Sequence, residues 1–563
     1  MSTRRPLIAL VAAVVVAMTA AGCGTGVSNS SSGSAGTVKK GGILNIGTTS
    51  GIDSLNPFIA IESQAYNAFV MEYPQLVQYG PGIKLEGDWA TSWKVSNGGK
   101  TYTFNLKPGG KWSDGVPLTA EDAAWTGNTI IKYKSGPSAV LAAALTHIKN
   151  FVATGPDTLV INYDQPIGNA LAQLEQFWVL PKHVWDKQVG NNGKDLKTYR
   201  PEQNLPTVAA GPYTITSYQE KGTTVFKPNP YFYGPKSNAA AVALTYYTNS
   251  TSMIADLQAG TLDFVDQVPF DAAQSVKQSG TFHVYEGAGA EVTNITFNSN
   301  PAKPKNRELL NPKVKEALEY ATDRQQIAKT VFQGFAFPWA NLISKQSQGA
   351  GWVNPAVKPL PFDINKANQI LDGLGYMRGS NGIRTVPATT GKYAQPAHQM
   401  SYDMMVPTSL DFSGQREFDI IANDWAKIGV KINFQNGGDS QQAYAIETAG
   451  NYTKYDMALW DWVGYIDPDF MLSVLTRPQW FSWSDTGYNN PAYDADYTKQ
   501  GTLTNFKQRQ ALVWKMEQEA YDQRQYIQLV NEELVTANAK NWTGFYPQLG
   551  AYCKCYYTSP HQT

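Results

Sequence analysis

The sequence predicts an α/β protein built from several lobes. Its 563 residues exceed what a single hydrophobic core usually organises. A hydrophobic content of 42%, an aromatic content of 12% and a charged content of 16% are typical of a folded chain and not of a disordered one. Stretches with strand and helix periodicity are mixed along the chain and no unit recurs at a fixed period, which favours α/β lobes over a repeat array.

Two segments in the first part of the chain are predicted to be strands. Residues 41–46 form an apolar run, and the polar stretch 53–57 that follows is typical of a loop. In residues 101–107 the apolar side chains alternate, so one face of this strand carries Tyr102, Phe104 and Leu106. Pro108 and Gly109 end the strand.

Two later segments follow the 3.6-residue period of a helix. The first opens at Asn311-Pro312, with proline in its favoured place in the first turn. Its apolar stripe consists of Val314, Ala317, Leu318 and Ala321. The second runs from Asn365 towards Leu374, and Gly375 supplies a C-terminal stop. Its stripe consists of Ala367, Ile370, Leu371 and Leu374.

Residues 1–22 are predicted to be a cleaved secretory signal peptide. Two arginines precede an apolar run over residues 7–18, which is too short to span a bilayer stably as a helix. The small residues directly before Cys23 resemble the bacterial lipobox, which implies lipidation of Cys23; an ordinary cleaved signal is the alternative. Residues 23–40 would be the lipidated cysteine and a flexible tether. We therefore expect an exported protein anchored to the outer face of the cytoplasmic membrane.

The charge balance and the metal-ligand residue types exclude several classes of function. Lys+Arg and Asp+Glu are both 46, and no basic stripe is present, so we expect no nucleic-acid partner. The five histidines show no metal-ligand spacing, and Cys553 and Cys555 are too few for a structural zinc site. The sequence is compatible with either a disulfide between these two cysteines or two reduced thiols. We predict no metal and no cofactor.

Residues 460–469 hold the richest set of candidate ligand contacts. If they begin in a strand, Trp460 and Trp462 point to one face and Asp461 to the other. Tryptophan rings exposed in a cleft would cover peptide side chains or stack on sugar rings, whereas rings in a core would fill volume. Asp461 would face a cationic ligand group, or else bond to backbone amides. The predicted ligand-binding residues are Trp460, Asp461, Trp462, Tyr465 and Trp480.

A series of motifs runs through nearly the whole chain. Residues 101–107, the segment Lys111-Trp112-Ser113-Asp114-Gly115 and residues 117–122 form one continuous motif. Further motifs follow at residues 180–183, 210–213, 229–232, 257–260, 311–324, 424–430 and 467–470. In type, order and spacing, these segments resemble extracellular solute-binding proteins of family 5, the dipeptide- and oligopeptide-binding lipoproteins of ABC importers.

The resemblance implies a periplasmic-binding-protein-like α/β fold of type II, with a pear-shaped body of three domains that closes around a ligand by a hinge motion. By analogy, domain II comprises residues 77–208 and domain III residues 291–535. Domain I would combine three segments, at residues 41–76, 209–290 and 536–563.

The resemblance also implies a function. The protein would act as a monomer that captures oligopeptides outside the membrane and delivers them to the permease and ATPase subunits of an ABC importer. Dipeptide-binding members carry an Asp for the ligand's amino terminus where this chain has Gly464, which disfavours strict dipeptide capture and leaves longer peptides, held through backbone hydrogen bonds. Oligosaccharide binding by the same architecture is the main alternative. A lipoprotein chaperone or sensory receptor is a more distant one.

No catalytic constellation is visible in the sequence. Asp461, Asp467 and Asp469 lie too close together in the chain to face each other across a cleft, as the carboxylates of a glycosidase must. Residues 99–101 lack the upstream glycine of a phosphate-binding loop, and residues 47–51 lack the Gly-x-Ser-x-Gly spacing of a nucleophile elbow. We predict that the protein is not an enzyme.

Overall fold

A computed structural model describes residues 40–60, 62–134, 139–142, 145–190, 192–546 and 554–563, all within one compact unit. The predictions made for the signal peptide, Cys23 and the tether up to residue 39 lie outside the described residues. Within the described part of the chain, no helix is both long and apolar enough to cross a membrane.

The largest sheet has eleven strands. Ten of them follow the order β17-β16-β18-β12-β19-β11-β1-β10-β9-β8, and β13 pairs with β19 outside this path. β1 runs parallel to β10 and β11, and β16 runs parallel to β17 and β18. The strands are β1 (Ile43–Thr48), β8 (Tyr213–Ser217), β9 (Thr223–Pro228), β10 (Ala241–Tyr246), β11 (Phe264–Val265), β12 (Phe282–Phe297), β13 (Ala336–Pro338), β16 (Ser401–Val406), β17 (Lys431–Asn436), β18 (Met457–Val463) and β19 (Tyr526–Ala539).

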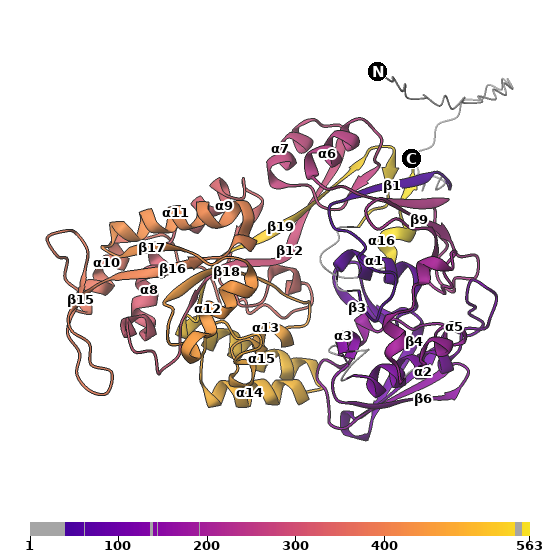
Figure 1. The fold of residues 1–563 in the computed structure, drawn as a ribbon, viewed down its shortest axis with the longest axis horizontal. Helices are drawn as coiled ribbons and strands as arrows, with labels where there is room; N and C mark the ends of the chain where they lie inside the picture. Colours follow the sequence, from indigo (N-terminus) through magenta and orange to yellow (C-terminus); the bar gives the residue numbers. More distant parts are fainter. Residues whose placement is uncertain (1–39, 61, 135–138, 143–144, 191, 547–553) are drawn as a thin grey trace, which may run out of the picture. The chain divides into compact units, whose positions relative to one another are not determined.

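The long strands β12 and β19 run side by side through the middle of this sheet (Figure 1). Their antiparallel ladder shifts register between Ala288 and Val292, where a bulge interrupts it. The buried side chain of Asn531 bridges this interruption, because its amide nitrogen donates to the carbonyl oxygens of Gly289 at 3.0 Å and Glu291 at 3.1 Å. A bulged ladder between two long strands is a natural place for the sheet to bend.

A second sheet of four strands has the order β4-β5-β7-β6. Its strands are β4 (Ala90–Ser96), β5 (Thr101–Leu106), β6 (Ile148–Gly155) and β7 (Thr158–Tyr163). The predicted strand over residues 101–107 is confirmed as β5, whose predicted apolar face is buried throughout. Three strand pairs complete the β structure: β2 (Val77–Gly80) with β3 (Lys84–Gly87), β14 (Thr385–Val386) with β15 (His398–Gln399), and β20 (Trp542–Thr543) with β21 (His561–Gln562).

Helices pack against these sheets along the chain (Figure 1). They are α1 (Ser63–Glu72), α2 (Ala120–Lys132), α3 (Ala139–Ala142), α4 (Ala170–Gln173), α5 (Lys182–Trp185), α6 (Ser250–Gln258), α7 (Phe270–Gln278), α8 (Pro312–Tyr320), α9 (Arg324–Thr330), α10 (Ile364–Gly373), α11 (Asp411–Lys427), α12 (Ser440–Tyr452), α13 (Asp469–Ser473), α14 (Pro491–Thr502), α15 (Phe506–Gln523) and α16 (Cys555–Thr558). Both predicted helices are confirmed, as α8 and α10. The side chain of Asn311 caps α8, and Gly375 takes the left-handed conformation, with a φ of 80°, that ends α10.

The buried apolar residues form several separate cores. One contains Leu44, Trp89 and Phe104, and another contains Ile295, Leu318 and Trp425. More than one core is what the chain length predicted. Near the C-terminus, Cys555 is disulfide-bonded, and its partner lies outside the described residues.

Candidate ligand-binding site

Trp460 and Trp462 lie on one face of β18, as the predicted strand requires. β18 pairs with β12, where Trp460 stands opposite Asn294 and Trp462 opposite Val292. The two indole rings are 6.4 Å apart, edge to face. Asp461 stands opposite Thr293 and therefore points to the other face of the sheet. β18 thus presents aromatic rings on one face and a carboxylate on the other.

The two tryptophans lie at the boundary between core and surface. The indole nitrogen of Trp462 donates to the buried carboxylate of Asp485 at 3.1 Å, and its ring packs against an apolar core. Trp460 is also half-buried, and its indole nitrogen has no hydrogen-bond partner among the described residues. Trp460 packs against Met405, Ala443 and Ala458, so both tryptophans contribute to the fold as well as to the surface.

Exposed rings continue from β18 into the loop that follows it. The rings of Tyr465 and Trp483 both pack edge-on against Phe470, at 5.6 and 5.4 Å, and the two are 56% and 54% exposed. Trp462 also contacts Phe470, at 5.8 Å. We call Trp460, Trp462, Tyr465, Phe470 and Trp483 the aromatic patch. Exposed rings in such a row offer a surface for an apolar or planar ligand group.

The far end of the aromatic patch faces residues from the first half of the chain. Burial raises the pKa of the Tyr465 hydroxyl, and the charge of Glu175 raises it further. Tyr465 in turn contributes to a raised pKa at Tyr66 of α1, where burial is the larger cause. The patch therefore lies where segments distant in sequence approach one another.

Trp480 is not brought into the aromatic patch. Its indole nitrogen donates to the carbonyl oxygen of Tyr488 at 2.8 Å, and the guanidinium of Arg477 lies 3.7 Å from the centre of its ring. It also packs against Tyr452 at 5.1 Å. These contacts hold Trp480 within its own loop, and Trp483 occupies the exposed position instead.

Four carboxyl groups from four elements meet on the opposite face of the sheet. They belong to Glu291 of β12, Glu417 of α11, Asp461 of β18 and Glu532 of β19, and we call them the carboxylate cluster. Glu417 is fully buried, and the other three are half-buried. Only Asp461 was a predicted site residue; the others are separated from it in sequence and carry no local motif.

The pKa values of the carboxylate cluster are all raised. Burial is the first cause at each residue, and it raises the pKa of Glu417 and of Glu532 to about 8. Repulsion from neighbouring carboxyls in the cluster adds to this rise at Glu291, Glu417 and Glu532. The cluster therefore retains protons near neutral pH.

The loop after β18 is fixed by contacts that leave its acidic residues unavailable. Both carboxylate oxygens of Asp467 accept from the guanidinium of Arg509, at 2.6 and 2.7 Å. Asp469 begins α13 and accepts from Gln500 at 2.7 Å and Tyr497 at 3.1 Å. Structural partners thus occupy both carboxylates.

Gly464 lies in this loop with room for a side chain. A Cβ atom placed there would meet its nearest neighbours, Met471 and Ser344, at 3.4 and 3.5 Å, which is ordinary contact. The amide of Gly464 donates to the carbonyl oxygen of Ala290 at 3.2 Å, so it lies directly beside Glu291 on β12. The carboxylate cluster is therefore close to Gly464, the position at which the resemblance implies an Asp.

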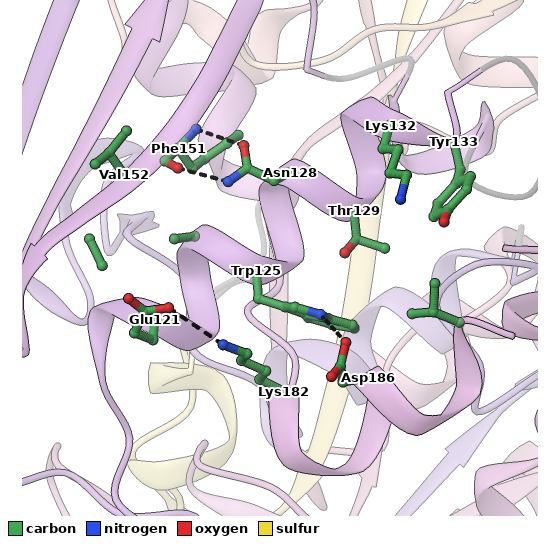
Figure 2. Close-up of a pocket in the computed structure, with 13 residues that line it drawn as sticks. Glu121, Trp125, Asn128, Thr129, Lys132, Tyr133, Phe151, Val152, Lys182 and Asp186 are labelled. Atoms are coloured by element: carbon green, nitrogen blue, oxygen red, sulfur yellow. Dashed lines mark hydrogen bonds and ion pairs between the residues drawn. The ribbon is translucent and has the colours of Figure 1, made fainter. Parts of the chain in front are cut away.

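A separate pocket of about 480 Å³ lies on the surface formed by α2, β6 and α5 (Figure 2). Several of its polar groups pair with one another: Trp125 donates to Asp186 at 2.8 Å, and Lys182 lies 3.5 Å from Glu121. Asn128 and the backbone of Phe151 exchange two further hydrogen bonds. None of the predicted ligand-binding residues lines this pocket.

No group of three or more His, Cys, Asp or Glu residues in the described part of the chain is arranged to hold a metal ion. The carboxylate cluster is thus not a metal-ligand set. Asp114 and His183, which fall in the recognised motifs, bond to each other at 2.7 Å beside the turn at Gly115 and serve that turn.

Comparison with known proteins decides the family. Residues 84–483 match the family described as bacterial extracellular solute-binding proteins, family 5 Middle. The chain is a family 5 extracellular solute-binding protein. This confirms the family predicted from the motifs, and it confirms that the protein binds a solute and is not an enzyme. The protein is extracytoplasmic, as this family is.

Two curated relatives illustrate the breadth of the family. The family 5 protein is 27% identical to "Probable D,D-dipeptide-binding periplasmic protein DdpA" of Escherichia coli (strain K12) over 306 residues, which span 52% of this chain and 55% of that one. It is 24% identical to "Glutathione-binding protein GsiB" of the same strain over 510 residues, which span 88% of this chain and 90% of the relative.

Solved structures share the fold of this family 5 protein. DppA from Helicobacter pylori, in complex with the peptide STSA, matches with a TM-score of 0.68 at 20% identity, covering 93% of this chain and 98% of that one. AppA from Bacillus subtilis, in complex with a nonapeptide, matches with a TM-score of 0.67 at 18% identity, covering 94% and 100%. The predicted periplasmic-binding-protein fold is confirmed by these matches.

Proposed function

We propose that this solute-binding protein captures oligopeptides outside the cytoplasmic membrane and delivers them to the permease of an ABC importer, held at the membrane by a lipid on Cys23. The main observation behind this proposal is the exposed aromatic patch. On one side the patch borders the β12–β19 ladder, and on the other it faces segments of the first half of the chain. Relatives named for dipeptides and glutathione, and neighbours solved with a tetrapeptide and a nonapeptide, support a peptide ligand.

The proposal includes a division into three domains with boundaries near residues 76, 208, 290 and 535. The last two boundaries fall inside β12 and β19, beside the bulge that Asn531 bridges. Hinge closure at these two strands would bring the first half of the chain towards the aromatic patch. Ligand binding would then shift an open-to-closed equilibrium that an importer can sense.

Backbone hydrogen bonds and rings would share the recognition of a peptide. The half-exposed rings of Tyr465 and Trp483 are wide, rigid surfaces that tolerate different side chains. The same exposed rings also favour the second candidate function, oligosaccharide binding, because sugar rings stack on aromatic faces.

Identification of the solute that remains bound during gentle purification separates the two candidates. The protein would be purified without unfolding, denatured, and its released small molecules identified by mass spectrometry. Recovery of peptides longer than two residues supports oligopeptide capture. Recovery of oligosaccharides without peptides would overturn it. Capture of another folded protein and no small molecule would favour the chaperone or receptor alternative.

A further inference from the structure

The turn between β2 and β3 is held in an unusual backbone conformation. It lies between the paired residues Gly80 and Lys84, and within it Ile83 takes the left-handed conformation, with a φ of 60°. A β-branched side chain rarely adopts that conformation, because it crowds the backbone there. Backbone strain of this kind persists only where surrounding contacts impose it. The contacts around Ile83 therefore indicate what the turn does.

The side chain of Ile83 is buried between two parts of the chain that are distant in sequence. A small apolar cluster joins three residues of the β2–β3 hairpin to two residues of the second half of the chain: Tyr79, Ile83 and Leu85 with Ala350 and Ile466. Ile83 is 4% exposed and Ile466 is 2% exposed. The hairpin has two strands of four residues each and is too small to bury apolar side chains alone. Separation of the two halves would therefore expose the contact between Ile83 and Ile466 to water.

A backbone hydrogen bond joins the same two halves at a second point. The amide of Gly168 donates to the carbonyl oxygen of Gly501, near the end of α14, at 2.7 Å. A Cβ atom on Gly168 would lie 2.9 Å from the carbonyl oxygen of Gln500 and 2.7 Å from that of Leu503. Both distances are too short for a real Cβ contact, so this close approach of the backbones requires glycine. Two contacts therefore join the halves, and neither uses a ring of the aromatic patch.

The loop that receives the hairpin is tied to the strands of the hinge. A short 3-10 helix over residues 345–348 makes the connection. At one end of this connection, the side chain of Gln346 donates to the carbonyl oxygen of Gly464 in the loop, at 2.7 Å. At the other end, the amide of Lys345 donates to the side-chain oxygen of Asn531, which bridges the bulge between β12 and β19. Docking of the hairpin is thus connected to the place where the sheet bends.

We propose that the β2–β3 turn, residues 80–84, is a latch that holds the two halves of the protein closed in the absence of a solute. Closure docks Ile83 against Ile466 and brings Gly168 onto α14, and these contacts offset the strain of the left-handed turn. Because the latch uses no ring of the aromatic patch, a solute adds its contacts to a closed state that is already populated. The latch builds on the hinge closure proposed above and not on the identity of the solute.

The latch changes the affinity for a solute without contacting it. The apparent affinity of a binding protein falls with the fraction of molecules in the binding-competent state. A weakened latch lowers the closed fraction, so it lowers the affinity for every solute by the same factor. Loss of a ring that touches the solute has a different effect on each solute. The latch therefore sets the general affinity, and the aromatic patch sets the selectivity.

The first experiment tests the docked turn by disulfide cross-linking. A Cβ atom on Gly349 would lie 3.6 Å from the Cβ of Ile83, which is within the range for a disulfide. The double variant Ile83→Cys/Gly349→Cys would be dialysed free of solute and mildly oxidised, and the cross-link identified by peptide mapping. We expect it to form at least tenfold faster than in Lys84→Cys/Gly349→Cys, the matched control, since Lys84 is the next residue and is exposed. Equal rates, or no cross-link between positions 83 and 349, would overturn the latch.

The second experiment measures closure of the ligand-free protein by small-angle X-ray scattering. In Gly168→Ala, the three nearest neighbours of the added methyl group all belong to the second half, so it should wedge the halves apart. Ile83→Asn supplies a residue that accepts the left-handed turn but removes the apolar contact. We expect both variants to have a larger radius of gyration than the wild type.

Two matched controls should keep the radius of gyration of the wild type. They are Gly155→Ala, whose added Cβ meets no atom within 4 Å, and Ile43→Asn, at a position that is 53% exposed. An unchanged radius in either latch variant, even with a lower Tm, would assign those residues to the fold alone and refute the latch. Neither experiment contains a peptide, so failure of oligopeptide capture would leave the latch intact, and failure of the latch would leave oligopeptide capture intact.

Discussion

The pair formed by Asp467 and Arg509 should control the stability of the loop that carries Tyr465. The Arg509 side chain is 2% exposed and the Asp467 side chain 12% exposed, and they share two hydrogen bonds of 2.6 and 2.7 Å. Arg509 also bonds to Gln500 at 2.9 Å and lies over the ring of Trp352. Substitution Asp467→Asn removes the carboxylate that accepts two hydrogen bonds from this buried guanidinium. Removal of one partner of a buried ion pair costs about 3–5 kcal/mol.

We expect Asp467→Asn to lower the free energy of unfolding by about 3 kcal/mol, the lower end of that range, because asparagine retains one acceptor. The assay is urea unfolding followed by tryptophan fluorescence. The double variant Asp467→Leu/Arg509→Met removes both charges and should recover at least half of the loss, since an apolar pair needs no counter-charge.

A matched control is the pair of Asp496 and Lys515, in which the aspartate is 17% exposed, much like Asp467, but the lysine side chain is 63% exposed. Asp496→Asn should change stability by less than about 1 kcal/mol. The reasoning would be refuted by a loss below about 1 kcal/mol in Asp467→Asn, or by a double variant that is no more stable than the single one.

Two further predictions concern the two faces of β18. Trp462→Phe should lower the free energy of unfolding by about 1–3 kcal/mol in the same urea assay, because buried Asp485 loses the indole donor; an unchanged value would place Trp462 outside the core. Glu417→Gln should become progressively more stable than the wild type as the pH rises from about 4.5 to about 8. The raised pKa makes ionisation of Glu417 favour unfolding over that window, by about 1.4 kcal/mol per pH unit. A stability difference that is constant with pH would contradict the assigned pKa.

Local sequence patterns predicted the parts of the fold that depend on near neighbours. Alternation identified β5, and the apolar stripes with their capping residues identified α8 and α10. The face carried by Trp460 and Trp462 also followed from strand alternation alone. These features were predictable because each depends on contacts within a few residues of chain.

The rest of the site depends on contacts between distant segments. Glu291 and Glu532 meet Asp461 only because β12 pairs with both β18 and β19 in one sheet, and no local pattern encodes that pairing. The sequence also could not show that Trp483, and not Trp480, is the exposed ring. Trp480 is held by contacts with Arg477 and Tyr488, and these contacts depend on how the loop folds. Glu532 stands between Asn531 and Glu533 in a polar run of β19, so its sequence neighbours do not distinguish it.

The most direct test of solute capture at the aromatic patch is the affinity of the double variant Tyr465→Ala/Trp483→Ala. Both rings are more than half exposed, so the ligand-free variant should unfold within about 0.5 kcal/mol of the wild type. Titration of this double variant with an alanine pentapeptide that has a free amino terminus should show at least a tenfold loss of affinity relative to the wild type. Tyr231→Ala, which removes a ring that is 46% exposed elsewhere, should show no loss. Wild-type affinity in the double variant would contradict the assignment of the site.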